Sequence, residues 1–290
     1  MNLSLASIKK TFPEMGEIEY KIASSREEFE QSCALVYREY LKRGFILPKY
    51  YKSGLRITMH HIVPGMTTFI ALKDKQVVAT VTIIPDSPLG LPMDMGYKEE
   101  ADKFRNMGRA ICEVGYLAIN SDVFGRGLFS MFNFKKLDFM FTLFRMVMQY
   151  VVSRERYDDI CIVTNPKYMI FKFIPFDIIG KAKYYGYDRM AIKKKAAVAK
   201  RMDLKRMREN FDNPGLVFGA RITIYKMFFG SKVPAGIFEN KYKLSPEDLN
   251  YFFVKKSDIL KKLRKDEKEY IKEAHNLTEE EFDSLLKGRG

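Results

Sequence analysis

The first half of the chain contains one clear amphipathic helix, in which apolar residues recur every three or four positions. These positions are Phe29, Cys33, Val36, Tyr37 and Tyr40. Such spacing places all five on one face of a helix. The preceding Ser24-Ser25-Arg-Glu-Glu supplies a serine cap and an acidic first turn, and Gly44 supplies an end. We therefore expect a helix between Ser25 and Gly44.

Short apolar runs predict the strands of a sheet. The runs over 67–73 and 76–84 are separated only by the turn Lys73-Asp74-Lys75, which predicts a hairpin. A proline-rich loop over 85–92 ends this hairpin, and a polar helical piece follows over 96–106. The five expected strands of this part span 18–23, 67–73, 76–84, 109–120 and 159–164.

Helices and strands alternate in the second half of the chain. A glycine turn begins at Asp122 and leads into a long apolar helix over 128–152. Further strands are expected over 178–185 and 190–203, so this half of the sheet should include parallel neighbours. The fold class is therefore α/β (α+β), with a mixed central sheet flanked by helices. We expect three parts: a loose lead-in (1–17), a main domain (18–208) and a charged, mainly helical C-terminal extension (209–290).

Composition indicates which partners and which cellular environment to expect. Fifty basic and thirty-six acidic residues give a net charge of +14, which attracts acidic partners such as an acidic protein, anionic lipid or nucleic acid. Cys33, Cys112 and Cys161 are far apart and predict reduced core residues. The adjacent pair His60-His61 cannot share one face of a helix or strand, so we expect no metal site there. The first residues lack the apolar core of a signal peptide, so we expect a soluble, cytoplasmic protein.

The segment from Gly108 to Leu128 carries the most informative chemistry. It places Glu113 inside an apolar strand. Burial of a carboxylate costs free energy, so we expect Glu113 either to have an ion-pair partner or to take part in catalysis. The strand leads to Gly125-Arg126-Gly127 and then to a helix, an arrangement that makes an anion cradle of backbone N–H groups. Acyl transfer from a phosphopantetheine thioester needs such a cradle, a donor for the oxyanion and a base for the amine.

A purely structural interpretation of the same residues remains open. Gly-Arg-Gly is often a simple turn. Glu113 can also be an ion-pair partner of Arg109, because residues four apart lie on the same face of a strand.

The chain resembles the N-acyl amino acid synthases, which are similar to acyl-homoserine-lactone synthases and share the GNAT-like fold. The resemblance covers roughly residues 18–205, and its most specific part is Gly90-Leu-Pro-Met-Asp94 followed by Glu113-Val-Gly-Tyr-Leu-Ala118. The other matching pieces are Leu35 to Ile46, Val78 to Leu89, Arg109 to Cys112, and Asn165-Pro-Lys.

This resemblance implies an acyltransferase that joins a long-chain fatty acyl group to the amine of an amino acid. The implied donor is the 4′-phosphopantetheine thioester of an acidic acyl carrier protein, with no permanently bound cofactor and a coenzyme A thioester as the alternative donor. The family's strand carboxylate falls on Glu113. Leu117 and Ala118 would lie beside the thioester, and Gly125, Arg126 and Gly127 would bind the donor arm.

The chain departs from its homoserine-lactone relatives at Gly115 and Tyr116, where they carry Ser and Arg, and at Val36, where they carry an arginine. These departures argue against S-adenosylmethionine as the acceptor. Asp122 stands where the acetyl-coenzyme A loop has Gln or Arg, which argues against coenzyme A.

For the acceptor amino acid we expect Arg105, Arg109 and Tyr116 to form the binding site, because an arginine fork matches a carboxylate. The structural alternative for Arg105 is an ion pair with Glu99, Glu100 or Asp102. Asp86 and Asp94 flank the proline-rich loop and can orient an ammonium group or cap turns.

The remaining features allow two interpretations each. The aromatic and methionine residues of 128–150 can line an acyl tunnel or fill an ordinary core. The basic clusters 193–195 and 200–208 can dock a carrier protein or face solvent. Two other functions stay open: an acyl-coenzyme A-dependent N-acyltransferase, and a basic protein that binds membrane or nucleic acid. No helix-turn-helix, zinc-finger or RRM signature supports nucleic acid, whereas peripheral contact with an anionic membrane is compatible with catalysis.

Overall fold

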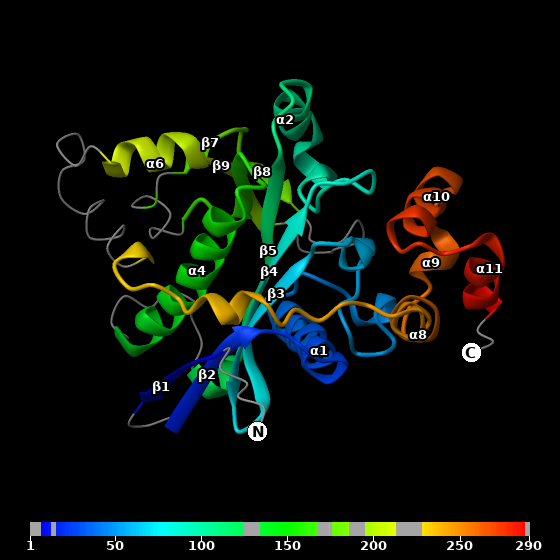
Figure 1. Ribbon diagram of the computed structural model, residues 1–290, viewed down its shortest axis with the longest axis horizontal. Helices are drawn as coiled ribbons and strands as arrows, with labels where there is room; N and C mark the ends of the chain where they lie inside the picture. The colour runs from blue at the N-terminus through cyan, green and yellow to red at the C-terminus, as the bar shows by residue number, and fades with distance from the viewer. Residues whose placement is uncertain are drawn as a thin grey trace.

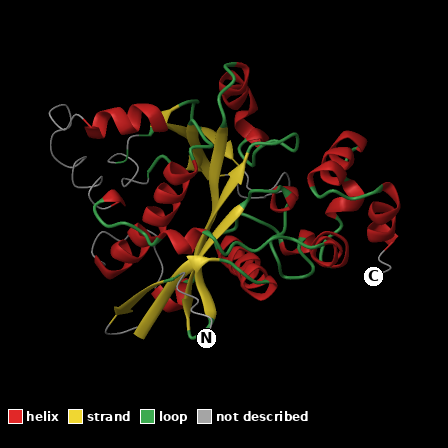
Figure 2. Ribbon diagram, in the orientation of Figure 1, coloured by secondary structure: helices red, strands yellow, loops and turns green. Residues whose placement is uncertain are grey.

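A mixed sheet runs through the molecule, with helices on both faces (Figures 1 and 2). The computed structural model describes residues 7–12, 16–124, 134–167, 174, 176–185, 195–212 and 228–287. Its strands are β1 Ile8–Phe12, β2 Gly16–Ile22, β3 Thr67–Lys73, β4 Gln76–Pro85, β5 Ile111–Ile119, β6 Asp159–Thr164, β7 Asp177–Ile178, β8 Lys183–Tyr185 and β9 Lys195–Asp203.

The helices include short 3-10 turns and one π-helical turn. The α-helices are α1 Arg26–Lys42, α2 Asp94–Asn106, α3 Ser121–Phe124, α4 Phe134–Arg154, α6 Leu204–Asp212, α8 Pro246–Asn250, α9 Ile259–Lys262, α10 Lys265–Ala274 and α11 Glu279–Lys287. The shorter turns are η1 Pro48–Tyr50, η2 Met59–Ile62, η4 Ala235–Phe238 and the π-helical η5 Tyr251–Lys255.

The strand order is β1-β2-β3-β4-β5-β6-β9-β7, with β8 also paired to β9. Among the described strands, β5 and β6 form the parallel pair, and the other neighbours are antiparallel. The expected hairpin of β3 and β4 is confirmed. Its turn places Asp74 and Lys75 at φ of 50° and 62°, the left-handed geometry that lets a two-residue turn follow the twist of the strands.

Two apolar layers hold the sheet between its helices. On one face, α4 buries Phe139, Leu143 and Val147 against strand residues such as Phe69 and Ile83. On the other face, α1 and α2 pack over the same strands (Figure 1). The described side chains of α4 thus belong to the core, and an acyl tunnel lined by 128–150 stays a prediction. No helix of the described chain is long and apolar enough to cross a bilayer.

Local sequence signals explain why α1 lies where it does. Ser25 caps the helix, and its hydroxyl accepts a hydrogen bond from the Glu28 N–H at 3.2 Å. The chain leaves the helix at Gly44, where φ is 68°. Both ends agree with the expectation from sequence, because capping and glycine termination depend on local chemistry.

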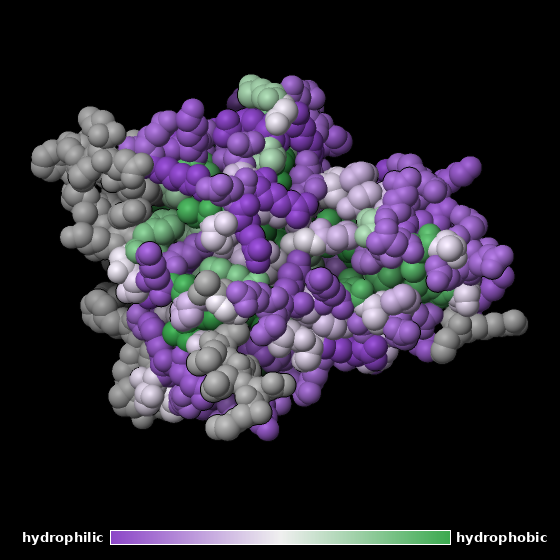
Figure 3. Space-filling view, in the orientation of Figure 1, coloured by the Kyte–Doolittle hydropathy of each residue, from purple (hydrophilic) through white to green (hydrophobic). Residues whose placement is uncertain are grey.

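The C-terminal extension forms a helical unit beside α1 (Figure 1). Leu249, Phe252 and Phe253 pack with Phe29 of α1 and with the segment Leu55–Met66, which links α1 to β3. His275 Nε2 lies 2.8 Å from the Ile62 carbonyl oxygen, which fixes this segment to α10. Hydrophobic side chains show among hydrophilic ones over α4 and over these C-terminal helices (Figure 3).

Three details differ from the sequence-based expectation. The lead-in contains a strand, β1, because Ile8–Phe12 pairs with β2 along the sheet edge. The residues directly after β5 form the short helix α3, which includes the expected start of the glycine turn at Asp122, and the glycines of that turn lie outside the described residues. The expected strand over 178–185 is two short strands, β7 and β8. The expected parallel neighbours are present as β5 and β6, whereas β9 runs antiparallel to β6. The boundaries at 17/18 and 208/209 stay predictions.

Candidate functional site

Glu113 lies in the middle of β5 and is 4% exposed. Its Oε2 accepts a hydrogen bond of 2.6 Å from the Met93 N–H. Burial raises the pKa of Glu113 to about 8, the nearby Asp94 adds to this rise, and the Met93 bond and Arg105 oppose it. A carboxylate with a pKa near the working pH suits proton abstraction from an amine.

The loop Pro85–Pro92 places the Met93 amide over Glu113. Gly90 has a φ of 73°, and a Cβ there would lie 2.5 Å from Asp94 Oδ2. Asp94 Oδ2 accepts the Leu91 N–H at 3.0 Å, which closes this turn. The proline-rich loop and its aspartate thus act as a support for the carboxylate.

The sheet opens directly after Glu113. The parallel pairing of β5 with β6 covers Ile111, Cys112 and Glu113 and ends there, although both strands continue. Leu117 and Ala118 follow on the part of β5 that no longer pairs with β6, and they pack toward opposite faces of the sheet. Gly125, Arg126 and Gly127, the expected donor cradle, lie outside the described residues.

Tyr116 occupies a bulge in β5. The register of β4 and β5 shifts between the pairs Thr80–Ala118 and Thr82–Gly115, so two residues of β5 face one of β4. Tyr116 has a φ of 51°, a left-handed conformation that is rare for a bulky side chain and is often found at functional sites. Its hydroxyl lies 2.6 Å from Thr58 Oγ1.

Arg105 is surrounded by carboxylates. It makes ion pairs of 2.7 Å with Asp86, 2.8 Å with Asp94 and 2.7 Å with Asp102. Asp102 is one of the partners that the structural alternative names, whereas Glu100 binds Lys183. The role of Arg105 in acceptor binding stays a prediction, but its charge is already matched by three acidic groups.

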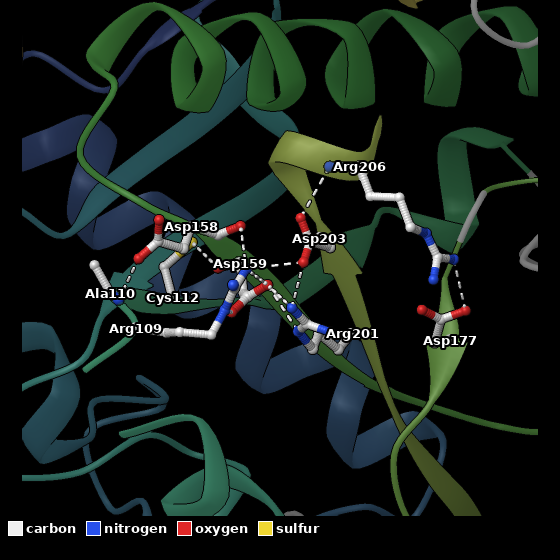
Figure 4. A network of polar contacts seen from close by, with 9 residues as sticks. All are labelled: Arg109, Ala110, Cys112, Asp158, Asp159, Asp177, Arg201, Asp203 and Arg206. Atoms are coloured by element: carbon white, nitrogen blue, oxygen red, sulfur yellow. Dashed lines mark hydrogen bonds and ion pairs between the residues drawn. The ribbon is translucent and has the colours of Figure 1, made fainter. Parts of the chain in front are cut away.

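Arg109 belongs to a buried ion-pair network at the start of β6 (Figure 4). Its guanidinium binds Asp159, which is fully buried, and Asp203 at 2.9 Å. Arg201 binds the same two carboxylates at 2.7 and 2.6 Å. Arg109 thus pairs with Asp159 instead of Glu113. The network connects the start of β5 with β6 and β9. Its assignment to the acceptor stays a prediction.

The basic cluster over 200–208 is partly used inside the protein. Lys200 is buried, Arg201 lies in the network of Figure 4, and Arg206 binds Asp177 at 3.0 Å. Lys193 and Lys194 lie outside the described residues. The segment 200–208 therefore offers fewer unpaired exposed charges than the sequence suggests, and its role in docking a carrier protein stays a prediction.

A second polar cluster beside Tyr116 was missed by the sequence analysis. Arg56, Thr58, His60 and His61 come from the segment before β3, and their polar groups gather at the Tyr116 side chain. His61 stacks on Tyr116 with ring centroids 4.5 Å apart. Burial lowers the pKa of His60 to about 4 and of His61 to about 3, so both are neutral at pH 7.

The pair His60-His61 and the three cysteines were the other candidates for metal or redox chemistry in the sequence. Among the described residues, no group of three or more His, Cys, Asp or Glu side chains could hold an ion. All three cysteines are free and buried, as expected. The only signal for the cluster in the sequence was the unusual density of polar residues at 56–61.

Comparison with known proteins identifies the family. A sequence profile of the N-acyl amino acid synthase FeeM family matches residues 31–187, more than half of the chain. The structure of FeeM, an N-acyl amino acid synthase from uncultured soil microbes, is 24% identical with a TM-score of 0.52. That match covers 66% of this chain and 93% of FeeM.

Two acyl-homoserine lactone synthases are more distant matches. LasI is 17% identical with a TM-score of 0.42, over 64% of this chain and 89% of LasI. The coenzyme A-dependent BjaI is 11% identical with a TM-score of 0.45, over 71% of this chain and 99% of BjaI. A search of curated protein sequences found no match. The profile match confirms the resemblance to the synthases, and the match to FeeM shows the fold that they share: the chain belongs to the N-acyl amino acid synthase FeeM family, a family of N-acyltransferases.

Proposed function

We propose that this chain moves a long-chain fatty acyl group from the thioester of an acyl carrier protein to the amine of an amino acid. The product is an N-acyl amino acid. The observation that carries this proposal is the position of Glu113, a buried carboxylate with a raised pKa, where β5 and β6 stop pairing. At that point a base lies next to the edge of β5 that is not paired with β6.

The reaction needs a base because the amine of a free amino acid is protonated near neutral pH. Glu113 takes the proton, directly or through water, and the amine then attacks the thioester carbonyl carbon. The C–N bond forms and the C–S bond breaks. The sulfur of the phosphopantetheine arm leaves as a thiol, because it takes the proton that the attacking nitrogen loses. Backbone groups of β5 beyond Glu113 are not used by pairing with β6, so they are available to the donor arm and to the developing oxyanion.

The charge of the chain favours a carrier protein as the donor. Carrier proteins are acidic, and a net charge of +14 increases the rate of encounter with an acidic partner. Asp122, which departs from the acetyl-coenzyme A loop, makes an ion pair of 2.8 Å with Lys42. Both donors share the 4′-phosphopantetheine arm, so coenzyme A thioesters are the alternative.

The location of the protein is part of the proposal. We place the reaction in the cytoplasm, where acyl carrier protein and free amino acids are both present. An acylated amino acid is itself a lipid, so peripheral contact with an anionic membrane would suit its release.

Mass spectrometry of the reaction products tests this proposal. Purified protein is given palmitoyl acyl carrier protein and an equimolar mixture of the twenty amino acids, and a parallel reaction receives palmitoyl-coenzyme A. We expect one or a few acylated amino acids, formed faster from the carrier protein. The control contains carrier protein with an unloaded arm. No acylated amino acid from either donor would refute the proposal.

A further inference from the structure

Two exposed arginines near the carboxyl end of α4 are held in place by uncharged neighbours. Arg154 donates a hydrogen bond of 2.9 Å to the Phe238 carbonyl oxygen, and its guanidinium carbon lies 5.2 Å from the ring centroid of Tyr150. The guanidinium carbon of Arg156 lies 5.9 Å from the ring centroid of Tyr157. Carbonyl and ring contacts orient a guanidinium without cancelling its charge, so both cations can still attract an anion.

Arg156 also lies beside the turn that leads into β3. Gly65 in this turn has a φ of 91°, and a Cβ there would lie 3.0 Å from Arg156 Nη1 and 3.3 Å from Pro85 Cγ. Pro85 is the last residue of β4. A side chain at position 65 would therefore press on both groups, and the glycine leaves room for the guanidinium beside the end of β4.

The segment that leads into α8 carries two lysines. The Tyr242 N–H donates to the Ala23 carbonyl oxygen at 2.9 Å, and the Tyr242 ring lies 5.7 Å from the ring of Phe29 in α1. These contacts hold the segment where it crosses in front of the sheet toward α8 (Figure 1). On either side of Tyr242, Lys241 is half-buried and Lys243 is exposed.

These two lysines and the two arginines form one group of positive charges. Burial is the main cause that lowers the pKa of Lys241, to about 8, and the charges of three other residues lower it further: Arg156, Arg154 and Lys243. Lys241 still keeps its proton in most molecules at pH 7, so all four side chains repel one another. We call Arg154, Arg156, Lys241 and Lys243 the α4 cation cluster.

No carboxylate of the described chain balances the α4 cation cluster. None of its four members forms an ion pair with a described residue, and the same holds for Glu155 and Glu239 of the same two segments. By contrast, Arg105 and Arg109 are each paired with several aspartates. A group of like charges with one member half-buried costs free energy, which a bound anion would offset.

We propose that the α4 cation cluster binds free phosphate or a phosphate monoester. This inference goes beyond the proposed function, because the cluster lies outside the catalytic site described above. A phosphate monoester carries a charge of about −1.5 to −2 near pH 7, whereas a carboxylate or a phosphodiester carries a single charge and would compensate less of the cluster. Arginine forks bind two phosphate oxygens at once, and lysine adds a point charge.

The same phosphate chemistry is available from two sources. One is a soluble phosphate, and the other is the headgroup of phosphatidic acid, a lipid that ends in a phosphate monoester. The half-buried position of Lys241 suits one compact group better than the broad surface of an acidic protein.

Calorimetric titration of the full chain with inorganic phosphate tests the soluble source. We expect the wild type to bind, and Lys241→Gln and Arg156→Gln to bind about tenfold or more weakly, because each loses one charged contact. Lys255→Gln removes an exposed lysine of η5, and therefore the same charge, and should bind as the wild type does. Lys243→Gln changes an exposed member of the cluster, so it gives the same test without altering a half-buried position.

Vesicle flotation tests the lipid source. Phosphatidylcholine vesicles that contain phosphatidic acid are compared with vesicles of equal surface charge that contain phosphatidylglycerol, whose phosphate is a diester. A preference for phosphatidic acid that Lys241→Gln and Arg156→Gln lose and Lys255→Gln keeps would identify a lipid headgroup. Binding of inorganic phosphate without this preference would identify a soluble ligand.

Neither measurement uses acyl transfer, so a failure of the proposed function leaves both results valid. The inference would be overturned if the wild type neither bound inorganic phosphate nor preferred phosphatidic acid. It would equally be overturned if the cluster variants bound both probes as the wild type does, because the attraction would then come from the net charge of the whole chain.

Discussion

The backbone N–H of Met93 donates a hydrogen bond of 2.6 Å to the side chain of Glu113, in the middle of the sheet. This bond joins the end of the proline-rich loop to the centre of β5. It stabilises the charged form of a carboxyl group that burial otherwise keeps neutral. The balance of these two effects leaves Glu113 able to exchange a proton near neutral pH.

The pH dependence of acyl transfer should reveal the ionisation of Glu113. Because Glu113 acts as a base in its deprotonated form, kcat/KM should rise with pH up to about 8 and then level off, apart from the ionisation of the acceptor amine itself. The residual activity of Glu113→Gln should lack this step. Single-turnover rates between pH 5.5 and 9.5 provide the measurement. A step near pH 8 that persists in the variant would assign the ionisation elsewhere.

Protein stability should depend on the same group. The pKa of Glu113 is about 8 in the folded state and about 4.3 in an unfolded chain, so the folded protein binds the extra proton. Its contribution to stability is therefore fully present below about pH 4.3 and is lost as pH rises through about 8, at about 1.4 kcal/mol per pKa unit. Glu113→Gln should remove this decline. Urea unfolding at pH 5, 7 and 9 compares the two proteins, and parallel pH profiles would contradict the assignment.

The network of Figure 4 should be structural. Asp159→Ala leaves Arg109 and Arg201 without their shared buried carboxylate, so we expect a loss of about 3–5 kcal/mol in unfolding free energy. Arg206→Gln breaks an exposed pair with Asp177 and should cost less than about 1 kcal/mol. Chemical denaturation measures both. Similar losses of unfolding free energy in the two variants would show that the burial of Asp159 does not make its ion pairs more important for stability.

The C-terminal extension should hold the segment that contains Arg56 and His60. His275→Ala removes the contact with the Ile62 carbonyl and should cost about 1–2 kcal/mol. Hydrogen exchange should become faster in the segment Leu55–Met66 and stay unchanged in β3 and β4. Faster exchange throughout the sheet would instead indicate global destabilisation.

Sequence patterns predicted those parts of the fold that local chemistry controls. The Ser25 cap, the Lys73–Gln76 turn and the apolar run of β6 were placed closely, because each depends on neighbouring residues. The strand β1 was not predicted, because Ile8–Phe12 has little apolar periodicity and is held by pairing with β2. The antiparallel course of β9 depends on long-range packing that no local signal encodes.

The candidate site was predicted in the same uneven way. Glu113 stood out because a carboxylate in an apolar strand is unusual, and the structure places it at the point where the sheet opens. Arg105 and Arg109 were chosen because an arginine fork matches a carboxylate, but carboxylates of distant segments already pair with them, as Asp86 and Asp159 do. Arg56 was not singled out, because its position beside Tyr116 depends on how the segment before β3 folds over β5.

The turnover of Glu113→Gln tests the central claim most directly. The substitution keeps the shape of the side chain and an oxygen that can accept the Met93 N–H, so the fold and the unfolding temperature should be retained. Product formation from palmitoyl acyl carrier protein and the preferred amino acid should fall by about a hundredfold or more, the usual contribution of a general base. Near-normal turnover in a correctly folded variant would contradict the account.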